Sequence, residues 1–315
     1  MVVILGDMIA DFNLRIPSFP VQAGDLKRAD YLGLGPGGAT NVAIMAARLG
    51  LQVACLGEVG EDRFGNLVLE GLQREGIDTE GIIVSEDGET PVAGVIVDRH
   101  GEPAYLGYRG ELKVDTLLPE WSEAISKAEA FFADGWEDQP HEHKVILAGL
   151  KAASEAGVPT FFDPGPGNPE YSLEWQRRAV SQTNVLMATE AEASRLTGLP
   201  DPLASAKALL DEGPDLVVMK RGVAGSLLLS RDATEIAPGL PVEARDATGA
   251  GDSLDAAVIY GWLHELNLES LGALANATGA AKVRKLGTGH NVPTKPEVQE
   301  MLDRFLPEHA DILGS

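Results

Sequence analysis

Cysteine is almost absent from this chain of 315 residues: the sequence contains one, Cys55. A single thiol cannot form a disulfide within the chain, and the histidines are not spaced around it as zinc ligands would be. Cys55 lies in the apolar run Val53-Ala54-Cys55-Leu56, which predicts a buried thiol that takes part in packing only.

Positive charge is also scarce. The chain has 25 Lys and Arg against 48 Asp and Glu, a formal net charge of -23 and a pI near 4.5. Such a surface repels nucleic acids and anionic membranes, so neither is an expected partner. An anionic small molecule can still bind if backbone amides and a few cations gather around it.

Long apolar runs are missing as well. No stretch approaches the about 18 apolar residues of a membrane helix, and the N-terminus lacks the basic and apolar regions of a signal peptide. We therefore expect a soluble, cytoplasmic protein. The pattern G-x-x-x-x-G-K-[ST] does not occur, which excludes a P-loop kinase, and hydrophobic residues at 44% suffice for a core.

Short apolar runs alternate with helical segments along most of the chain. This order predicts an α/β fold with a central, mostly parallel sheet flanked by helices. Two stretches break the alternation, residues 13–35 and 91–109, and their short alternating runs and turns predict a small β lid. The α/β domain then comprises residues 1–12, 36–90 and 110–315.

The most informative stretch is Asp246-Ala247-Thr248-Gly249-Ala250-Gly251-Asp252, which leads into an apolar helix. Glycines let the backbone approach a ligand closely, and the first turn of a helix binds anions through its unpaired amides. A carboxylate beside such a site is suited to accept a proton from a hydroxyl that attacks phosphorus. The alternative is that Asp252 merely suits the helix dipole.

A second glycine-rich stretch, Gly33-Leu34-Gly35-Pro36-Gly37-Gly38, spells the dinucleotide-binding pattern G-x-G-x-x-G. Alone it is a weak match, because Pro36 disfavours helical backbone just before it and the first strand of the chain lies well upstream. It keeps a dinucleotide-binding oxidoreductase open as an alternative.

Both glycine stretches resemble signatures of the ribokinase-like (PfkB-type) carbohydrate kinases. Asp246 to Asp252 matches the second signature except at Ala247, where Thr, Ser, Pro or Val is usual. The segment Gly37-Gly38-Ala39-Thr40-Asn41-Val42-Ala43, with Gly50 and Gly60 downstream, fits the first. The resemblance implies that Asp252 is the catalytic base and that Gly249, Ala250 and Gly251 form the anion hole. The amides there are expected to lower the pKa of Asp252.

The resemblance also implies the sugar contacts, namely Asp11, Gly37, Gly38 and Asn41. Tyr108-Arg109 resembles the Tyr-Arg pair with which some keto-deoxy-gluconate kinases bind a carboxylate, although Arg109 could equally be a surface cation of the lid.

For the nucleotide and metal, Thr189 and Glu192 stand where the family has Asn-x-x-Glu, so Glu192 would hold Mg²⁺ through water. Thr189 could instead be a plain N-cap. The remaining nucleotide contacts implied are Lys220, Gly222, Gly225, Thr248 and Asn276. Asp246 and Thr248 would hold a monovalent cation such as K⁺.

The implied reaction is transfer of the ATP γ-phosphoryl group to a primary hydroxyl of a small sugar, with a ketose or keto-sugar acid favoured. A nucleoside or ribose kinase of the same family is the alternative. A catalytically idle sugar or nucleotide sensor is less favoured because Asp252 and its anion hole are intact. We expect a homodimer formed through the exposed edges of the lid.

Overall fold

The computed structural model describes residues 1–135, 143–166 and 173–314. In these residues the main sheet has nine strands in the order β13-β12-β11-β10-β9-β8-β1-β4-β5. All neighbours pair in parallel except β11 with β12 and β12 with β13. The strands are β1 (Val2–Leu5), β4 (Val53–Gly60), β5 (Ile82–Ser85), β8 (Ala130–Asp134), β9 (Thr160–Asp163), β10 (Val185–Thr189), β11 (Leu216–Lys220), β12 (Ser226–Ser230) and β13 (Thr234–Ala237).

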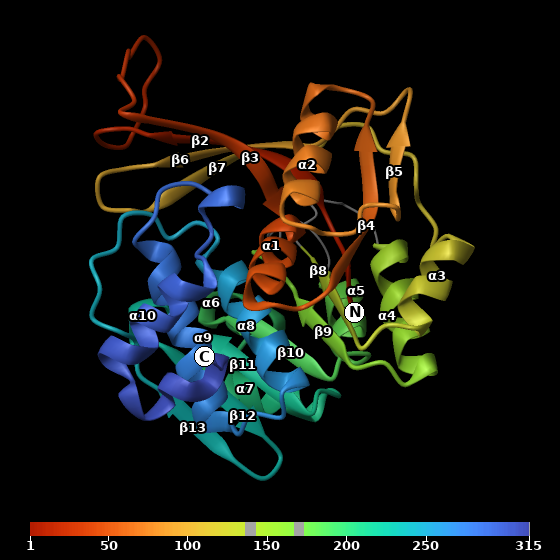
Figure 1. The fold of residues 1–315 in the computed structure, drawn as a ribbon, viewed down its shortest axis with the longest axis vertical. Coiled ribbons are helices and arrows are strands. Elements are labelled where there is room, and N and C mark those ends of the chain that lie inside the picture. The colour runs from red at the N-terminus through yellow and green to blue at the C-terminus, as the bar shows by residue number, and fades with distance from the viewer. Residues whose placement is uncertain (136–142, 167–172, 315) are drawn as a thin grey trace.

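Helices cover both faces of this sheet (Figure 1). One face packs against α1 (Ala39–Leu49), α2 (Arg63–Arg74), α8 (Ala250–Leu263), α9 (Leu268–Val283) and α10 (Lys295–Phe305). The other packs against α3 (Pro119–Ser126), α4 (Lys144–Ala156), α5 (Glu174–Val180), α6 (Glu190–Thr197) and α7 (Pro202–Asp211).

The central strands are apolar on both sides because both sides are covered. In β1, Ile4 packs into one core while Val3 and Leu5 pack into the other. Successive side chains of a strand point to opposite faces, so a continuous apolar run is the pattern that a doubly covered parallel strand requires. The predicted α/β fold is confirmed.

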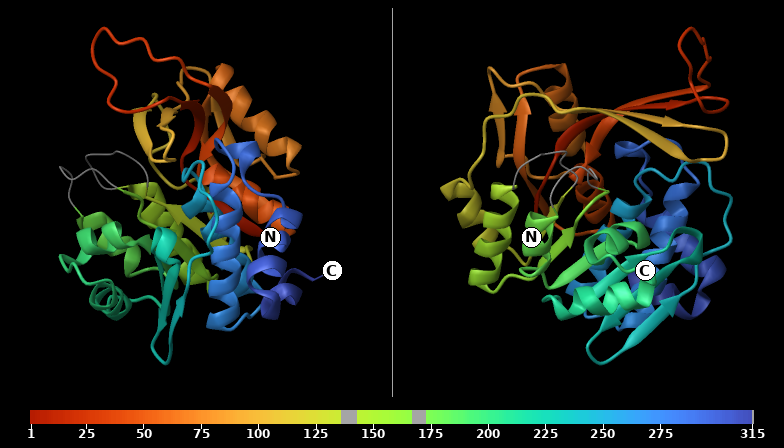
Figure 2. Two further views of the ribbon diagram at one scale, coloured as in Figure 1. Left: turned by 90° about the vertical axis from the view of Figure 1, so that its left-hand side faces the viewer. Right: turned by 180° about the vertical axis from the view of Figure 1, so that it is seen from behind.

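A second, four-stranded sheet lies beside one end of the main sheet, in the order β3-β2-β6-β7 (Figure 2). Its strands are β2 (Met8–Arg15), β3 (Tyr31–Gly38), β6 (Val92–Val97) and β7 (Pro103–Tyr108). It corresponds to the lid expected at 13–35 and 91–109, but β2 begins before residue 13 and β3 continues past residue 35. Asp11 therefore lies within a lid strand and not in a loop of the α/β domain.

The position of Gly33 to Gly38 argues against the dinucleotide-binding alternative. A dinucleotide fingerprint needs these glycines in the turn between a parallel strand and its helix. Here they lie within β3, which pairs antiparallel with β2 over its whole length. In the described ranges, no helix is long and apolar enough to cross a membrane. Cys55 is buried, as expected.

Candidate active site

The carboxyl ends of several parallel strands meet the N-terminal end of α8 below the lid. Asp163 ends β9, Thr189 ends β10 and Lys220 ends β11. In an open α/β sheet this edge is where ligands bind. A cleft of about 980 Å³ lies here. The predicted site residues that line it are Asp11, Gly38, Asn41, Arg109, Thr189, Glu192, Lys220, Thr248, Gly249, Gly251 and Asp252.

Asp252 faces the cleft from the first turn of α8. The turn before it is made by Gly249, whose φ of 76° is the left-handed conformation that glycine adopts without strain. Asn41 Nδ2 donates a hydrogen bond to Asp252 Oδ2 at 2.8 Å. The two signatures thus meet directly in space, with the Asn of the first holding the carboxylate of the second.

The pKa of Asp252 is raised to about 6, contrary to the expectation that nearby amides would lower it. Burial is the largest cause, and the neighbouring Asp163 raises it further, whereas Lys220 and Asn41 oppose the rise. A carboxyl group with this pKa is ionised at neutral pH and is a better proton acceptor than an ordinary aspartate.

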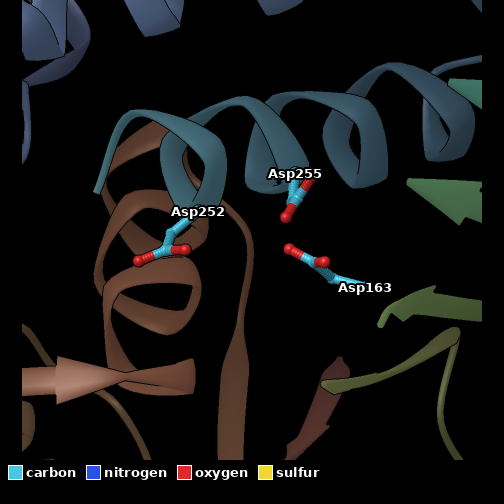
Figure 3. A group of neighbouring side chains, drawn as sticks. All are labelled: Asp163, Asp252 and Asp255. Atoms are coloured by element: carbon cyan, nitrogen blue, oxygen red, sulfur yellow. The ribbon is translucent and has the colours of Figure 1, made fainter. Parts of the chain in front are cut away.

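Two further aspartates lie beside Asp252 and were not predicted. Carboxylate oxygens of Asp163, Asp252 and Asp255 all lie within 4.8 Å of one another (Figure 3). Lys220 Nζ contacts Asp163 at 2.7 Å and Asp255 at 3.1 Å. Burial alone would lower the pKa of Lys220, but Asp163 and Asp255 outweigh it and raise that pKa well above its ordinary value. Lys220 therefore supplies one positive charge that is shared between these two buried carboxylates.

The predicted sugar-binding residues gather at the other end of the cleft. The Asp11 carboxylate lies over Gly37, where an added Cβ would be 2.1 Å from it, so only glycine leaves room. Thr288 Oγ1 donates to Asp11 Oδ2, and Asn13 Nδ2 donates to Thr288 Oγ1 at 3.1 Å. Burial raises the pKa of Asp11 to about 7, opposed by the hydrogen bond from Thr288.

Asn41 links this group to the catalytic end. Its Oδ1 accepts the backbone N–H of Gly289 at 2.8 Å, while its Nδ2 contacts Asp252. Both amide atoms of the side chain are thereby fixed in orientation.

Thr189 and Glu192 form a capping box at the start of α6. Thr189 Oγ1 accepts the N–H of Glu192 at 3.2 Å, and Glu192 Oε2 accepts the N–H of Thr189 at 2.7 Å. Thr189 thus acts as the N-cap that the sequence left open as an alternative. Glu192 still lines the cleft, and burial raises its pKa.

Asp246 holds its own loop together rather than facing the cleft. Its Oδ1 accepts the N–H of Thr248 at 2.9 Å, and its Oδ2 accepts the N–H of Gly287 at 2.7 Å. The ammonium of Lys282 lies at the same loop, where Nζ donates to the Asp246 carbonyl at 3.4 Å. Sequence analysis did not predict this lysine, because its role depends on a contact between segments distant in the chain.

Arg109 and Tyr108 differ in their surroundings. Arg109 lines the cleft from the end of β7 with its side chain exposed. The Tyr108 hydroxyl instead donates to Glu89. Both members of the predicted Tyr-Arg pair line the cleft, and the Tyr108 hydroxyl is already engaged by Glu89.

Several predicted residues are absent from the described lining of the cleft: Gly37, Gly222, Gly225, Asp246, Ala250 and Asn276. Asn276 Nδ2 donates to the carbonyls of Ala237 and Pro238 at 2.9 and 3.0 Å, which fixes α9 against the end of β13. The Ala250 N–H donates to the Ala247 carbonyl at 3.2 Å, so the amides of its neighbours Gly249 and Gly251 are the better candidates for the anion hole.

Comparison with known proteins identifies the family. Residues 1–295 match the description "pfkB family carbohydrate kinase". An ATP-dependent ribose-1-phosphate kinase from Halopiger xanaduensis is 31% identical over 298 residues, covering 94% of this chain and 96% of that protein. A nucleoside kinase from Methanothermobacter thermautotrophicus is 30% identical over 303 residues, covering 96% and 94%.

The fold agrees with solved structures. Arabidopsis thaliana ribokinase complexed with ribose and ATP superposes with a TM-score of 0.80 at 23% identity, covering 96% of this chain and 98% of that one. The chain belongs to the pfkB family of carbohydrate kinases, phosphotransferases with an alcohol group as acceptor. Its relatives include ribose kinases, nucleoside kinases and fructokinases, so it is a sugar or nucleoside kinase.

Proposed function

We propose that this protein transfers the γ-phosphoryl group of ATP to a primary hydroxyl of a small sugar, with Asp252 as the general base. The observation that carries this proposal is Asp252 itself: a carboxylate facing the cleft at a helix N-terminus, with a pKa raised to about 6 by burial and with Asn41 fixing its orientation. A carboxylate so placed accepts the proton of the attacking hydroxyl, while the amides at Gly249 and Gly251 stabilise the charge on the transferred group.

The other cleft residues bind and orient. Asp11 and Asn41 would hold sugar hydroxyls, with Gly37 and Gly38 admitting the sugar close to the backbone. The lid strands β2 and β7 contribute Asp11 and Tyr105 to the lining of the cleft. Nucleotide contacts through Lys220, Gly222, Gly225, Thr248 and Asn276 remain predictions, of which Lys220 and Thr248 line the cleft.

Oxygen donors suited to Mg²⁺ are present. Mg²⁺ is commonly held by one or two carboxylates, waters and the phosphates of the substrate. Glu192, Asp252 and Asp163 all line the cleft, but Asp163 is already paired with Lys220, as is Asp255. We infer that Glu192 holds Mg²⁺ through water. The ion would neutralise charge on the phosphates of bound ATP. One E. coli structure of the same fold is a complex with ATP and Mg²⁺.

For the acceptor, we favour a ketose or a keto-sugar acid over ribose or a nucleoside. Arg109 lines the lid side of the cleft and offers a positive charge that suits the carboxylate of a keto-sugar acid. ATP consumption with Mg²⁺ should be measured over fructose, keto-deoxy-gluconate, ribose, adenosine and inosine. Arg109→Gln should raise KM for a keto-sugar acid and leave KM for a neutral ketose unchanged. Turnover of nucleosides alone would favour the alternative acceptor class, and no ATP consumption with any acceptor would contradict the proposed reaction.

Replacing Asn41 with Ala should raise the KM for the sugar strongly and leave the KM for ATP near that of the wild type. The side chain is placed for the acceptor hydroxyls, and its loss also frees Asp252, so kcat should fall as well. Steady-state kinetics with each substrate varied in turn would measure both effects. A defect confined to the ATP KM would mean that the two halves of the cleft are wrongly assigned.

We also propose a homodimer formed through the outer face of the lid. Leu34, Phe12 and Leu106 lie in one row across its strands, and Leu34 and Leu106 are 54% and 66% exposed. A row of exposed apolar side chains on a small sheet is suited to pairing with a second copy.

Light scattering at micromolar concentration should give the mass of a dimer, and Leu106→Lys should give a monomer. Ile236→Lys is the matched control, because Ile236 is 61% exposed on β13, at the far edge of the main sheet from the lid. A wild-type monomer would contradict the proposal.

A further inference from the structure

The ammonium of Lys282 is buried under the loop that carries the anion site. Lys282 lies in the last turn of α9 and is fully buried, with an exposed fraction of 0%. Its Nζ donates to the backbone carbonyls of Asp246 and Lys285, at 3.4 Å each. Within the part of the chain that the structure describes, no carboxylate is recorded within 4.0 Å of it as an ion pair.

Several groups around this ammonium favour a positive charge. The carbonyl ends of α9 point here, and the C-terminal end of a helix stabilises cations. Asp246 and Asp252 act on Lys282 at longer range, and Lys285 is the opposing cation. Burial lowers the pKa of Lys282 to about 8, so the ammonium form still predominates at neutral pH. Carbonyl oxygens around a buried unit charge are also what a bound monovalent cation would require.

The same loop is where Asp246 and Thr248 were expected to hold K⁺. Both carboxylate oxygens of Asp246 already accept backbone N–H groups, and its carbonyl accepts from Lys282. A K⁺ ion at that carbonyl would lie beside a second buried positive charge, which is strongly unfavourable. The residues present therefore do not fit a monovalent cation at this loop.

We propose that the Lys282 ammonium takes the place of a monovalent cation in this protein, so that the kinase works without K⁺. The proposal rests on the proposed kinase function. It makes Lys282 a positioning residue that acts through the loop and does not touch the substrate.

The contacts show how a charge here would order the anion site. The Asp246 carbonyl, which accepts from Lys282, belongs to the same peptide unit as the Ala247 N–H. That N–H donates to the Gly101 carbonyl, in the turn between β6 and β7, at 3.2 Å. The N–H groups of Arg245 and Asp246 donate to the Val283 carbonyl at the end of α9. An added Cβ at Gly249 would be 3.4 Å from Lys282 Cε. Lys282 thus supports the loop from Asp246 to Gly249 from below, between α9 and the lid.

The first test compares kinase rates in K⁺ with rates in tetramethylammonium at equal ionic strength. For the wild type, kcat should be the same in both. The thermal midpoint should also be the same in both salts, because a specifically bound K⁺ would raise it. A wild-type kcat that requires K⁺ would overturn the proposal while leaving the kinase function intact. Absence of ATP consumption in either salt would instead count against the proposed function.

The second test uses Lys282→Met, which keeps the unbranched side chain up to the ε position and removes the charged ammonium group. In tetramethylammonium its kcat should fall by about tenfold or more, within the usual range of coupling between two sites. Added K⁺ should restore kcat and raise the thermal midpoint, because the vacated carbonyls can then bind the ion. A purely structural lysine would give a variant whose defect no K⁺ concentration repairs, and that result would overturn the proposal.

Lys285→Met is the matched control. Lys285 lies three residues further on, but its Nζ contacts Glu297 at 2.9 Å on a partly exposed surface. This variant should behave like the wild type in both salts. A K⁺ requirement in Lys285→Met equal to that in Lys282→Met would show that the effect is not specific to the buried ammonium and would contradict the assignment.

Discussion

Replacing Asp252 with Asn should lower kcat by about 10²–10⁴-fold, the usual scale for losing general-base assistance. That corresponds to about 3–5 kcal/mol of activation free energy. Asn keeps the size of the side chain, so the sugar and ATP should still bind. It cannot accept the proton of the attacking hydroxyl. Steady-state kinetics, with binding of both substrates measured by calorimetry, would separate the loss of kcat from a loss of affinity.

The pH dependence of the wild type provides an independent check on the same residue. The base must be ionised, and the pKa of Asp252 is raised to about 6. The wild-type kcat should therefore be constant above neutral pH and fall as pH drops through about 6. Asp252→Asn should lose this acidic limb. If the variant keeps more than about a tenth of the wild-type kcat, Asp252 is only a residue that suits the helix dipole.

The fold could be predicted because its signals are local. Apolar runs such as Val2 to Leu5 indicate strands that are covered on both faces. The alternation of strands and helices predicts that these strands pair in parallel. The extent of the lid was harder to predict, since β2 and β3 continue the chain smoothly from the α/β domain. Their pairing from Met8↔Gly38 to Arg15↔Tyr31 joins segments whose individual sequences carry little strand pattern.

The candidate site could be predicted in part for the same reason. Asp252 and Asn41 belong to contiguous motifs, so a sequence shows them directly. Asp163 and Lys282 do not, because each acquires its role from a partner distant in the chain: Lys220 for the first and the Asp246 carbonyl for the second. One local signal was available, namely that Asp255 follows Asp252 by three residues and so lies on the same helix face.

The direction of the Asp252 pKa shift could not be read from the sequence either. Amides at a helix N-terminus lower the pKa of a carboxyl group, whereas burial and a second carboxylate raise it. Of these effects, the sequence shows only the amides at the start of the helix. Only the fold shows that Asp252 is buried and that Asp163 lies nearby, and these two effects raise the pKa of Asp252 to about 6.

Replacing Lys220 with Met should lower the free energy of unfolding by about 3–5 kcal/mol, the usual cost of removing one partner from a buried ion pair. Lys220 and Asp163 are 8% and 5% exposed in their side chains, and Asp255 is fully buried. Without the ammonium, the two carboxylates would face each other with no compensating charge. Denaturant unfolding of the wild type and the variant would measure the difference.

The pH dependence and a control variant show whether charge is the cause. Burial already raises the pKa of Asp255 well above its ordinary value, and Lys220 opposes that rise, so losing Lys220 should raise this pKa further. The folded variant then binds a proton more tightly than the unfolded chain does, so the variant should regain stability relative to the wild type as pH falls. Lys151→Met removes the same charge from an exposed pair with Glu155 and should cost under about 1 kcal/mol. A Lys220→Met variant no less stable than Lys151→Met would show that the buried pair does not hold α8 to the end of β9.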